Sequence, residues 1–91
     1  MSHTTQDKTK LLSRVRRLRG QMDAIERALL ADAGCGEVMH LVAAVRGAIG
    51  GLSHELIEHH LRSHLLEGET DDTARAQAAE ELLAVLRTYV K

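Results

Sequence analysis

Two histidines four residues apart are the feature of the sequence best suited to chemistry. In a helix, His60 and His64 fall one above the other on the same face, so their imidazoles can be directed at one point. The chain has one thiol, Cys35, which stands between two glycines, and another histidine, His3, near its start. Imidazole and thiolate are both ligands of transition metals. These places therefore suggest one divided metal site.

The spacing alone leaves a second interpretation open. Histidine pairs occur by chance on helix surfaces, and a single cysteine is often a small buried hydrophobe. If a metal is bound and Cys35 begins the helix that carries His60 and His64, about 25 helical residues, or nearly 40 Å of rise, separate thiol from imidazoles. The thiol of the same chain cannot then reach the histidines, so a second chain has to complete the site.

The amino-terminal segment carries a dense basic cluster. Four arginines fall within six residues: Arg14, Arg16, Arg17 and Arg19. Residues 1–27 hold seven basic and three acidic residues, whereas residues 28–91 hold five basic and ten acidic residues. A solvated helix face is one interpretation, but the lack of an acidic residue within the cluster favours a phosphate-rich partner. No aromatic residue is interleaved for stacking on single strands, so we expect double-stranded DNA.

Hydrophobic periodicity predicts three helices, two of them long, and therefore an all-α fold. The helices are expected at about Thr5 to Ala31, Glu37 to Leu66 and Thr73 to Val90. Ala33–Gly36 should separate the first helix from the second, and the acidic segment Glu67–Asp72 should separate the second from the third. Three residues of that segment can cap the third helix: Thr70, Asp71 and Asp72.

The first predicted helix has the most regular apolar pattern. Its members recur at intervals of four and three residues: Leu11, Val15, Leu18, Met22, Ile25 and Leu29. We expect this seam to pack against another helix, with the arginines on neighbouring faces. The second helix contains Gly47, Gly50 and Gly51. Each is unfavourable by about 1 kcal/mol relative to alanine, so they indicate close helix contact or a local irregularity. A phosphate-binding loop is excluded because no strand precedes them.

Composition indicates a single domain, residues 1–91, with a thin core. The 91 residues include no Phe, no Trp and one Tyr, and short chains of this kind are commonly stabilised by oligomerisation. We see no signal peptide and no stretch of about 18 apolar residues that would span a bilayer. The expectation is a cytoplasmic protein without membrane association, whose single thiol stays reduced.

A set of short motifs runs along the whole chain. It comprises Met1–Thr4, Asp7–Lys8 ahead of Arg14–Gln21, the isolated Cys35, Ala43–Ala48, Gly51–Leu52, His60–Leu61 and Tyr89–Lys91. Together these motifs resemble the CsoR/RcnR family of all-helical transcriptional repressors that sense metals or aldehydes. The resemblance implies a homotetramer, built as a dimer of dimers, that binds operator DNA without effector and releases it when the effector binds.

The resemblance also implies the effector. Four positions distinguish members of the family, and here they are His3, Cys35, His60 and His64, with Cys35 of one protomer meeting the two later histidines of its partner. This set matches nickel and cobalt sensors, and the amine of Ser2, once the initiator methionine is removed, would add a donor. Ni(II) or Co(II) is therefore expected to derepress a metal-efflux gene, with Zn(II) as an alternative.

The residues also allow other effectors and functions to be considered. A copper(I) sensor of the family would have a second cysteine in place of His64. A formaldehyde- or thiol-reactive sensor would use Cys35 as a nucleophile, although formaldehyde sensors usually have a proline amine and an acidic residue where this chain has Ser2 and His64. No pairing of carboxylates with a base suggests an enzyme. Three histidines are expected at the surface: His40, His54 and His59.

Overall fold

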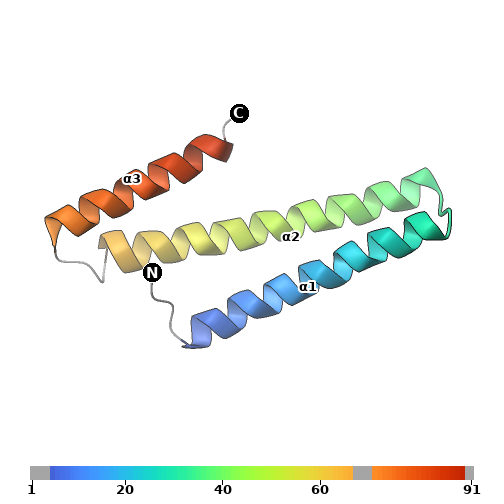
Figure 1. The fold of residues 1–91 in the computed structure, drawn as a ribbon, viewed down its shortest axis with the longest axis horizontal. Coiled ribbons are helices and arrows are strands. Elements are labelled where there is room, and N and C mark those ends of the chain that lie inside the picture. The colour runs from blue at the N-terminus through green and yellow to red at the C-terminus, as the bar shows by residue number, and fades with distance from the viewer. Residues whose placement is uncertain (1–4, 67–70, 90–91) are drawn as a thin grey trace. The chain divides into compact units, whose positions relative to one another are not determined.

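The computed structural model describes residues 5–66 and 71–89, and all of their regular structure is helical. α1 spans Thr5–Leu30, α2 spans Cys35–Leu61 and continues into a π-helical turn, η1, at Arg62–Leu66, and α3 spans Asp72–Tyr89 (Figure 1). The predicted all-α fold with two long helices is confirmed. Nothing in the apolar pattern predicted the π-helical turn.

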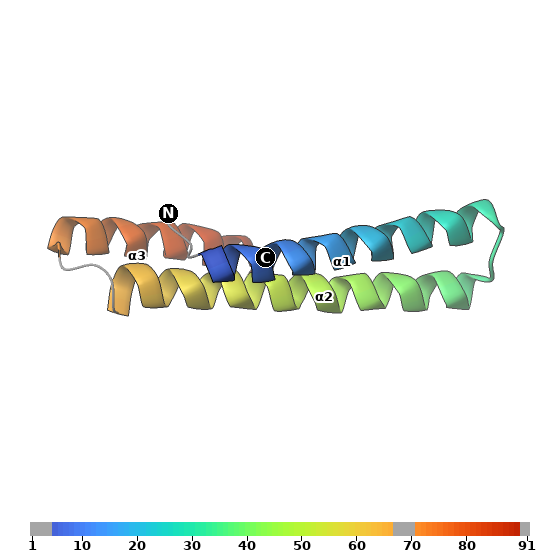
Figure 2. The ribbon, with the colours of Figure 1, turned by 90° about the horizontal axis from the view of Figure 1, so that it is seen from below.

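The chain divides into two compact units, Met1–Leu52 and Ser53–Lys91, with the boundary inside α2. The first unit contains α1 and the first part of α2, which form an antiparallel hairpin (Figure 2). The second contains the end of α2, η1 and α3. The expectation of one domain over residues 1–91 stays a prediction.

The hairpin turn is a Schellman motif built on an aspartate. Ala33 N donates to Ala28 O at 2.9 Å, Asp32 N donates to Leu29 O at 3.1 Å, and Asp32 has a φ of 54°. This left-handed position usually belongs to glycine. The helix therefore ends at Leu30, before the predicted Ala33–Gly36 break. Gly34 instead precedes the first residue of α2, Cys35, and its carbonyl accepts the Val38 amide at 3.2 Å.

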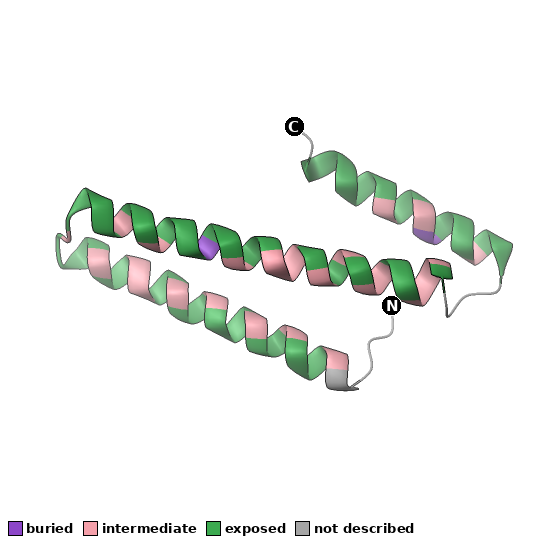
Figure 3. Ribbon diagram, turned by 180° about the vertical axis from the view of Figure 1, so that it is seen from behind, coloured by how far each residue is buried: buried purple, intermediate pink, exposed green. Residues whose placement is uncertain are grey.

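The face of α1 that packs on α2 differs from the predicted seam. Its half-buried residues recur at four- and three-residue intervals: Asp7, Leu11, Arg14, Leu18, Gln21, Ile25 and Ala28. They lie along the corresponding stripe of α2, which includes Val38, Leu41, Val45, Ala48 and Leu52 (Figure 3). Three predicted seam residues are instead exposed, at 38%, 53% and 60%: Val15, Met22 and Leu29.

α1 can pack through a face rotated slightly about its axis from the predicted one, because the predicted and observed stripes are adjacent. Both stripes contain Leu11, Leu18 and Ile25. Small side chains such as Ala28 allow close approach on one side, and the aliphatic stem of Arg14 can cover apolar surface while its charge reaches water. The prediction that all four arginines lie off the packing seam is therefore wrong for Arg14.

The second unit is organised by capping and by two contacts of α3. Asp71 caps α3, because its Oδ1 accepts the Thr73 amide at 3.0 Å, which confirms one of the three predicted candidates. α3 contacts η1, and Tyr89 OH donates to Ser53 Oγ at 2.9 Å. The unit therefore brings α3 against the helix that carries the paired histidines.

Burial is sparse, as the composition suggested. Among the described residues only Val45 and Ala78 are buried, at 7% and 6% exposure. The run Cys35–Leu66 is long and apolar enough, by length and composition, to cross a membrane, which corrects the expectation that no such stretch exists. However, Arg46 lies well inside this run, and a charged residue at the centre of a spanning helix is unfavourable by about 2.5–3.5 kcal/mol. Packing against other helices accounts equally well for its apolar character.

Candidate functional site

The paired histidines lie close together in the second unit. The ring centroids of His60 and His64 are 4.9 Å apart with an interplanar angle of 51°, and both side chains are half-buried. His60 belongs to the last turn of α2, whereas His64 is in the π-helical turn η1. The sequence spacing therefore placed the two rings side by side correctly, although the backbone between them is not purely α-helical.

A hydrogen bond to the backbone of α3 orients His60. His60 Nε2 lies 2.9 Å from Ala78 O, and Ala78 is one of the two buried residues. Because a carbonyl oxygen can only accept, Nε2 carries the proton and donates it. In the neutral ring this leaves the Nδ1 lone pair as the available donor to a metal. Metal-binding histidines commonly have this arrangement, in which a backbone carbonyl fixes the tautomer and the ring orientation.

The thiol lies in the other unit. Cys35 is a free, exposed cysteine and the first residue of α2. Among the residues that the structure describes, no group of three or more Cys, His, Asp or Glu side chains could hold a metal ion. His3 and Ser2, the two other predicted donors, lie outside the described residues. Within the described part of one chain, two of the predicted ligands, His60 and His64, thus lie together, whereas Cys35 belongs to the other compact unit.

A second apolar stripe of α2 joins these ligand positions in sequence. Its exposed large hydrophobic residues are Met39, Val42, Ile49 and Leu56. Counted from Cys35 through these residues to His60, the successive intervals are four, three, seven, seven and four residues. All of them are helical repeats of three or four residues or of one heptad. The apolar pattern of the second helix already included Val42, Ile49 and Leu56, but their separation as an exposed stripe with Met39 was not predicted. Both kinds of predicted ligand in α2 therefore recur in sequence at the same helical spacing as apolar residues that are exposed in the single chain.

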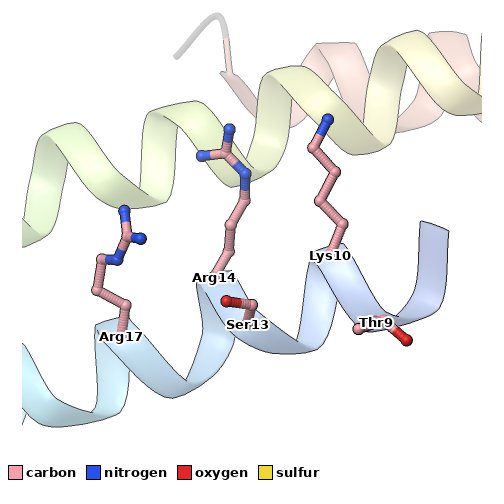
Figure 4. A pocket seen from close by; sticks show the side chains of 5 residues that line it. All are labelled: Thr9, Lys10, Ser13, Arg14 and Arg17. Carbon is pink, nitrogen blue, oxygen red and sulfur yellow. The ribbon is translucent and has the colours of Figure 1, made fainter. Parts of the chain in front are cut away.

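The basic cluster forms a groove on α1. The groove has a volume of about 590 Å³ and is lined by Thr9, Lys10, Ser13, Arg14 and Arg17 (Figure 4). The side chains of Lys10, Arg14 and Arg17 extend toward α2. Three cations and two hydroxyls that line one groove are typical of phosphate recognition. Of the four predicted arginines, Arg14 and Arg17 line the groove.

Lys10 and Ser13 were missed as candidate DNA-binding residues. They lie one turn before Arg14 and Arg17, so helical spacing from the arginines was the available signal.

The three unassigned histidines differ from one another. His40 is exposed, and His54 Nε2 lies 3.5 Å from Glu58 Oε2 with 81% of its side chain exposed. These two confirm the expectation of surface histidines. His59 is half-buried and is hydrogen-bonded through Nε2 to Ser63 Oγ at 3.3 Å.

Comparisons with known proteins agree on one family. Residues 7–88 match the family described as metal-sensitive transcriptional repressor. The chain is 38% identical to the transcriptional repressor RcnR of Citrobacter koseri and 47% identical to a Serratia marcescens protein described as an uncharacterized protein in the bioA 5′ region. Both alignments cover 100% of each chain.

A solved structure agrees with them. A variant of the formaldehyde-responsive regulator FrmR from Salmonella enterica serovar Typhimurium, in which a histidine replaces a glutamate, superposes with a TM-score of 0.91 at 45% identity. The match covers 98% of this chain and 100% of the other. The relatives thus include a transcriptional repressor and a formaldehyde-responsive regulator. The chain belongs to the CsoR/RcnR family of metal-sensitive transcriptional repressors.

Proposed function

We propose that this protein represses transcription by binding double-stranded operator DNA in its metal-free form, and that Ni(II) or Co(II) releases the DNA and derepresses a metal-efflux gene. One observation carries the metal part of the proposal. The hydrogen bond from His60 to Ala78 O leaves Nδ1 as the metal-binding nitrogen, next to the ring of His64. Two oriented imidazoles suit metals of intermediate softness better than copper(I).

The second chain is the source of the thiol in this proposal. If two copies of the exposed α2 stripe pair in antiparallel fashion about a two-fold axis near Gly47, positions at equal distances from the axis face each other. Cys35 then faces His60 of the partner subunit. The pairing also covers the exposed Met39, Val42, Ile49 and Leu56, which supports a dimer as the unit from which a tetramer is built.

The amino-terminal segment links metal to DNA. A bound Ni(II) or Co(II) supplies a positive centre that holds thiolate, imidazole and amine donors together. Beside Cys35, His60 and His64, the remaining donors are His3 and, after removal of the initiator methionine, the Ser2 amine. This segment leads into α1 at Thr5, so its capture changes the presentation of the basic groove. Metal and DNA then weaken each other's binding by the same factor.

The first experiment is an anaerobic titration of the reduced protein with Co(II), followed by visible and near-ultraviolet spectroscopy. The proposal predicts a thiolate charge-transfer band that saturates at one metal per chain and is absent from Cys35→Ala. His54→Ala, which alters an exposed histidine, is the matched control and should keep the band. Weak d–d bands support Ni(II)/Co(II) as effector, whereas intense ones support tetrahedral Zn(II). Affinity should rise with pH, because protons compete for thiolate and imidazole.

A formaldehyde-responsive or thiol-reactive repressor is the second candidate function. Its support is the 45% identical relative that is named for its response to formaldehyde, together with the exposure of Cys35. Mass spectrometry after exposure to formaldehyde separates the two functions. A covalent adduct on Cys35 that releases DNA, combined with no Co(II) charge-transfer band, would favour the aldehyde sensor.

A further inference from the structure

Arg14 is held differently from the other three arginines of the basic cluster. It is half-buried on the α1 face that packs against α2, whereas Arg16, Arg17 and Arg19 are exposed. Its guanidinium extends from α1 toward α2 between Lys10 and Arg17 (Figure 4). The position of this cation therefore depends on what α2 presents beneath it.

Beneath it, α2 presents a glycine. A Cβ atom added to Gly51 would lie 3.0 Å from Arg14 Nη1, and that contact is tighter than side chains normally make. A Cβ atom added to Gly47 or Gly50 would meet nothing within 4 Å. Of the two alternatives expected for these glycines, close helix contact or a local irregularity, close contact is thus found at Gly51 and not at Gly47 or Gly50. Gly51 is also half-buried and belongs to the same compact unit as Arg14.

The contact is with the far end of a flexible side chain. A methyl group at Gly51 would therefore displace the guanidinium, while the helix backbone could stay where it is. Arginine recognises phosphate through a planar fork of donors, and small errors in its placement reduce the number of hydrogen bonds it can make at once. The absence of a side chain at Gly51 thus bears on ligand binding more than on folding.

We infer that Gly51 is a positioning residue for DNA binding: it leaves the space in which Arg14 presents its guanidinium at the groove formed with Lys10, Ser13 and Arg17. The inference rests on the proposed DNA-binding function. It adds an uncharged residue of α2 to the determinants of DNA affinity.

The test compares three glycine-to-alanine variants of the full-length protein. The probe is a labelled random-sequence duplex of about 30 base pairs at low salt, because phosphate contacts do not depend on sequence. Gly51→Ala should bind about three- to tenfold more weakly, with a shallower dependence on salt. Gly50→Ala should bind as the unaltered protein does, and so should Gly47→Ala, which lies near the proposed two-fold axis, at protein concentrations where the dimer is intact. All three should keep or raise the melting temperature, since alanine is the better helix former.

A double-mutant cycle separates this role from a general effect on α2. In an Arg14→Ala background, Gly51→Ala should cause no further loss, whereas in an Arg17→Ala background the losses should multiply. If Arg14→Ala weakens DNA binding and Gly51→Ala does not, the inference is wrong. The inference is also wrong if Gly51→Ala loses helical structure, since the backbone would then absorb the clash. If Arg14→Ala itself leaves DNA binding unchanged, the proposed DNA-binding role of Arg14 fails instead.

Discussion

The two compact units hold their functional side chains by opposite means. In the α1–α2 hairpin, Arg14 occupies a space that exists because Gly51 has no side chain. In the second unit, a directed hydrogen bond to the backbone carbonyl of Ala78 orients His60. A position defined by empty space is sensitive to one added methyl group. A position defined by a backbone carbonyl does not depend on the size of a facing side chain and changes only if α3 moves, for example when a larger side chain replaces the buried Ala78. The hairpin is thus the unit in which point substitutions should tune function gradually.

Removal of a ligand from the second unit should have the largest effect. We expect His60→Ala to lower Co(II) affinity by more than about 100-fold, because loss of even an outer partner of a ligand typically lowers affinity about 10- to 100-fold. Competition titration with a chelator measures the change. DNA binding by the metal-free protein should be unaffected, and His54→Ala is the control. Unchanged affinity in His60→Ala would show that the histidine pair is not the metal site.

Truncation of a buried side chain in the hairpin core should have the second-largest effect. Val45→Ala should lower the free energy of unfolding by about 2 kcal/mol, measured by urea denaturation, because Val45 is 7% exposed between the two helices. Val42→Ala removes the same atoms from a residue that is 49% exposed in the single chain. Its effect should depend on protein concentration if that stripe is covered by a second chain. An equal loss of unfolding free energy in both variants, independent of protein concentration, would contradict the assignment of Val45 to the hairpin core and of Val42 to a surface covered by a second chain.

Within the basic cluster, the groove distinguishes arginines that neighbour one another in sequence. Arg17→Ala should weaken binding to duplex DNA about five- to tenfold and reduce the salt slope by about 1, because Arg17 lines the groove. Arg19→Ala, which removes the same charge on the same helix, should have a smaller effect. Fluorescence anisotropy at several salt concentrations tests both variants. Equal losses would mean that the groove is not the phosphate-binding surface.

The turn of the hairpin should yield the smallest effect, and it should be stabilising. Asp32 has a φ of 54°, a conformation that glycine adopts more readily. Asp32→Gly should therefore raise the free energy of unfolding by about 0.5–1 kcal/mol without changing metal or DNA binding. Ala31→Gly is the control, since this residue does not need a positive φ, and it should be neutral or destabilising. A lower stability for Asp32→Gly would contradict the role of the Schellman turn.

The sequence was informative wherever a local rule decides the structure. Three helices, the Asp71 cap and the adjacency of His60 and His64 all follow from periodicity, capping chemistry and helical spacing. These rules failed where two adjacent packing faces of the same helix are nearly equal in energy. Periodicity cannot choose between the stripe through Val15 and the stripe through Arg14, because both border Leu11, Leu18 and Ile25.

Other features depend on interactions that the local sequence does not encode. The turn was expected at glycines, but it uses Asp32, whose short polar side chain tolerates the left-handed conformation. The role of Gly51 depends on a residue far away in sequence. The site as predicted needs ligands from a second chain and from residues 2 and 3, so no single-chain pattern could define its geometry.

The π-helical turn at Arg62–Leu66 has a consequence for how the protein can evolve. A π-turn accommodates one residue more than the corresponding α-turn. Deletion of Ser63 would return the segment to regular α-helix and leave the paired histidines three residues apart, where helical neighbours still meet. The length of chain ahead of α3 can therefore change by one residue without separating the pair. A lineage of such repressors can in this way acquire or lose a residue at this point and still keep both imidazoles on one face.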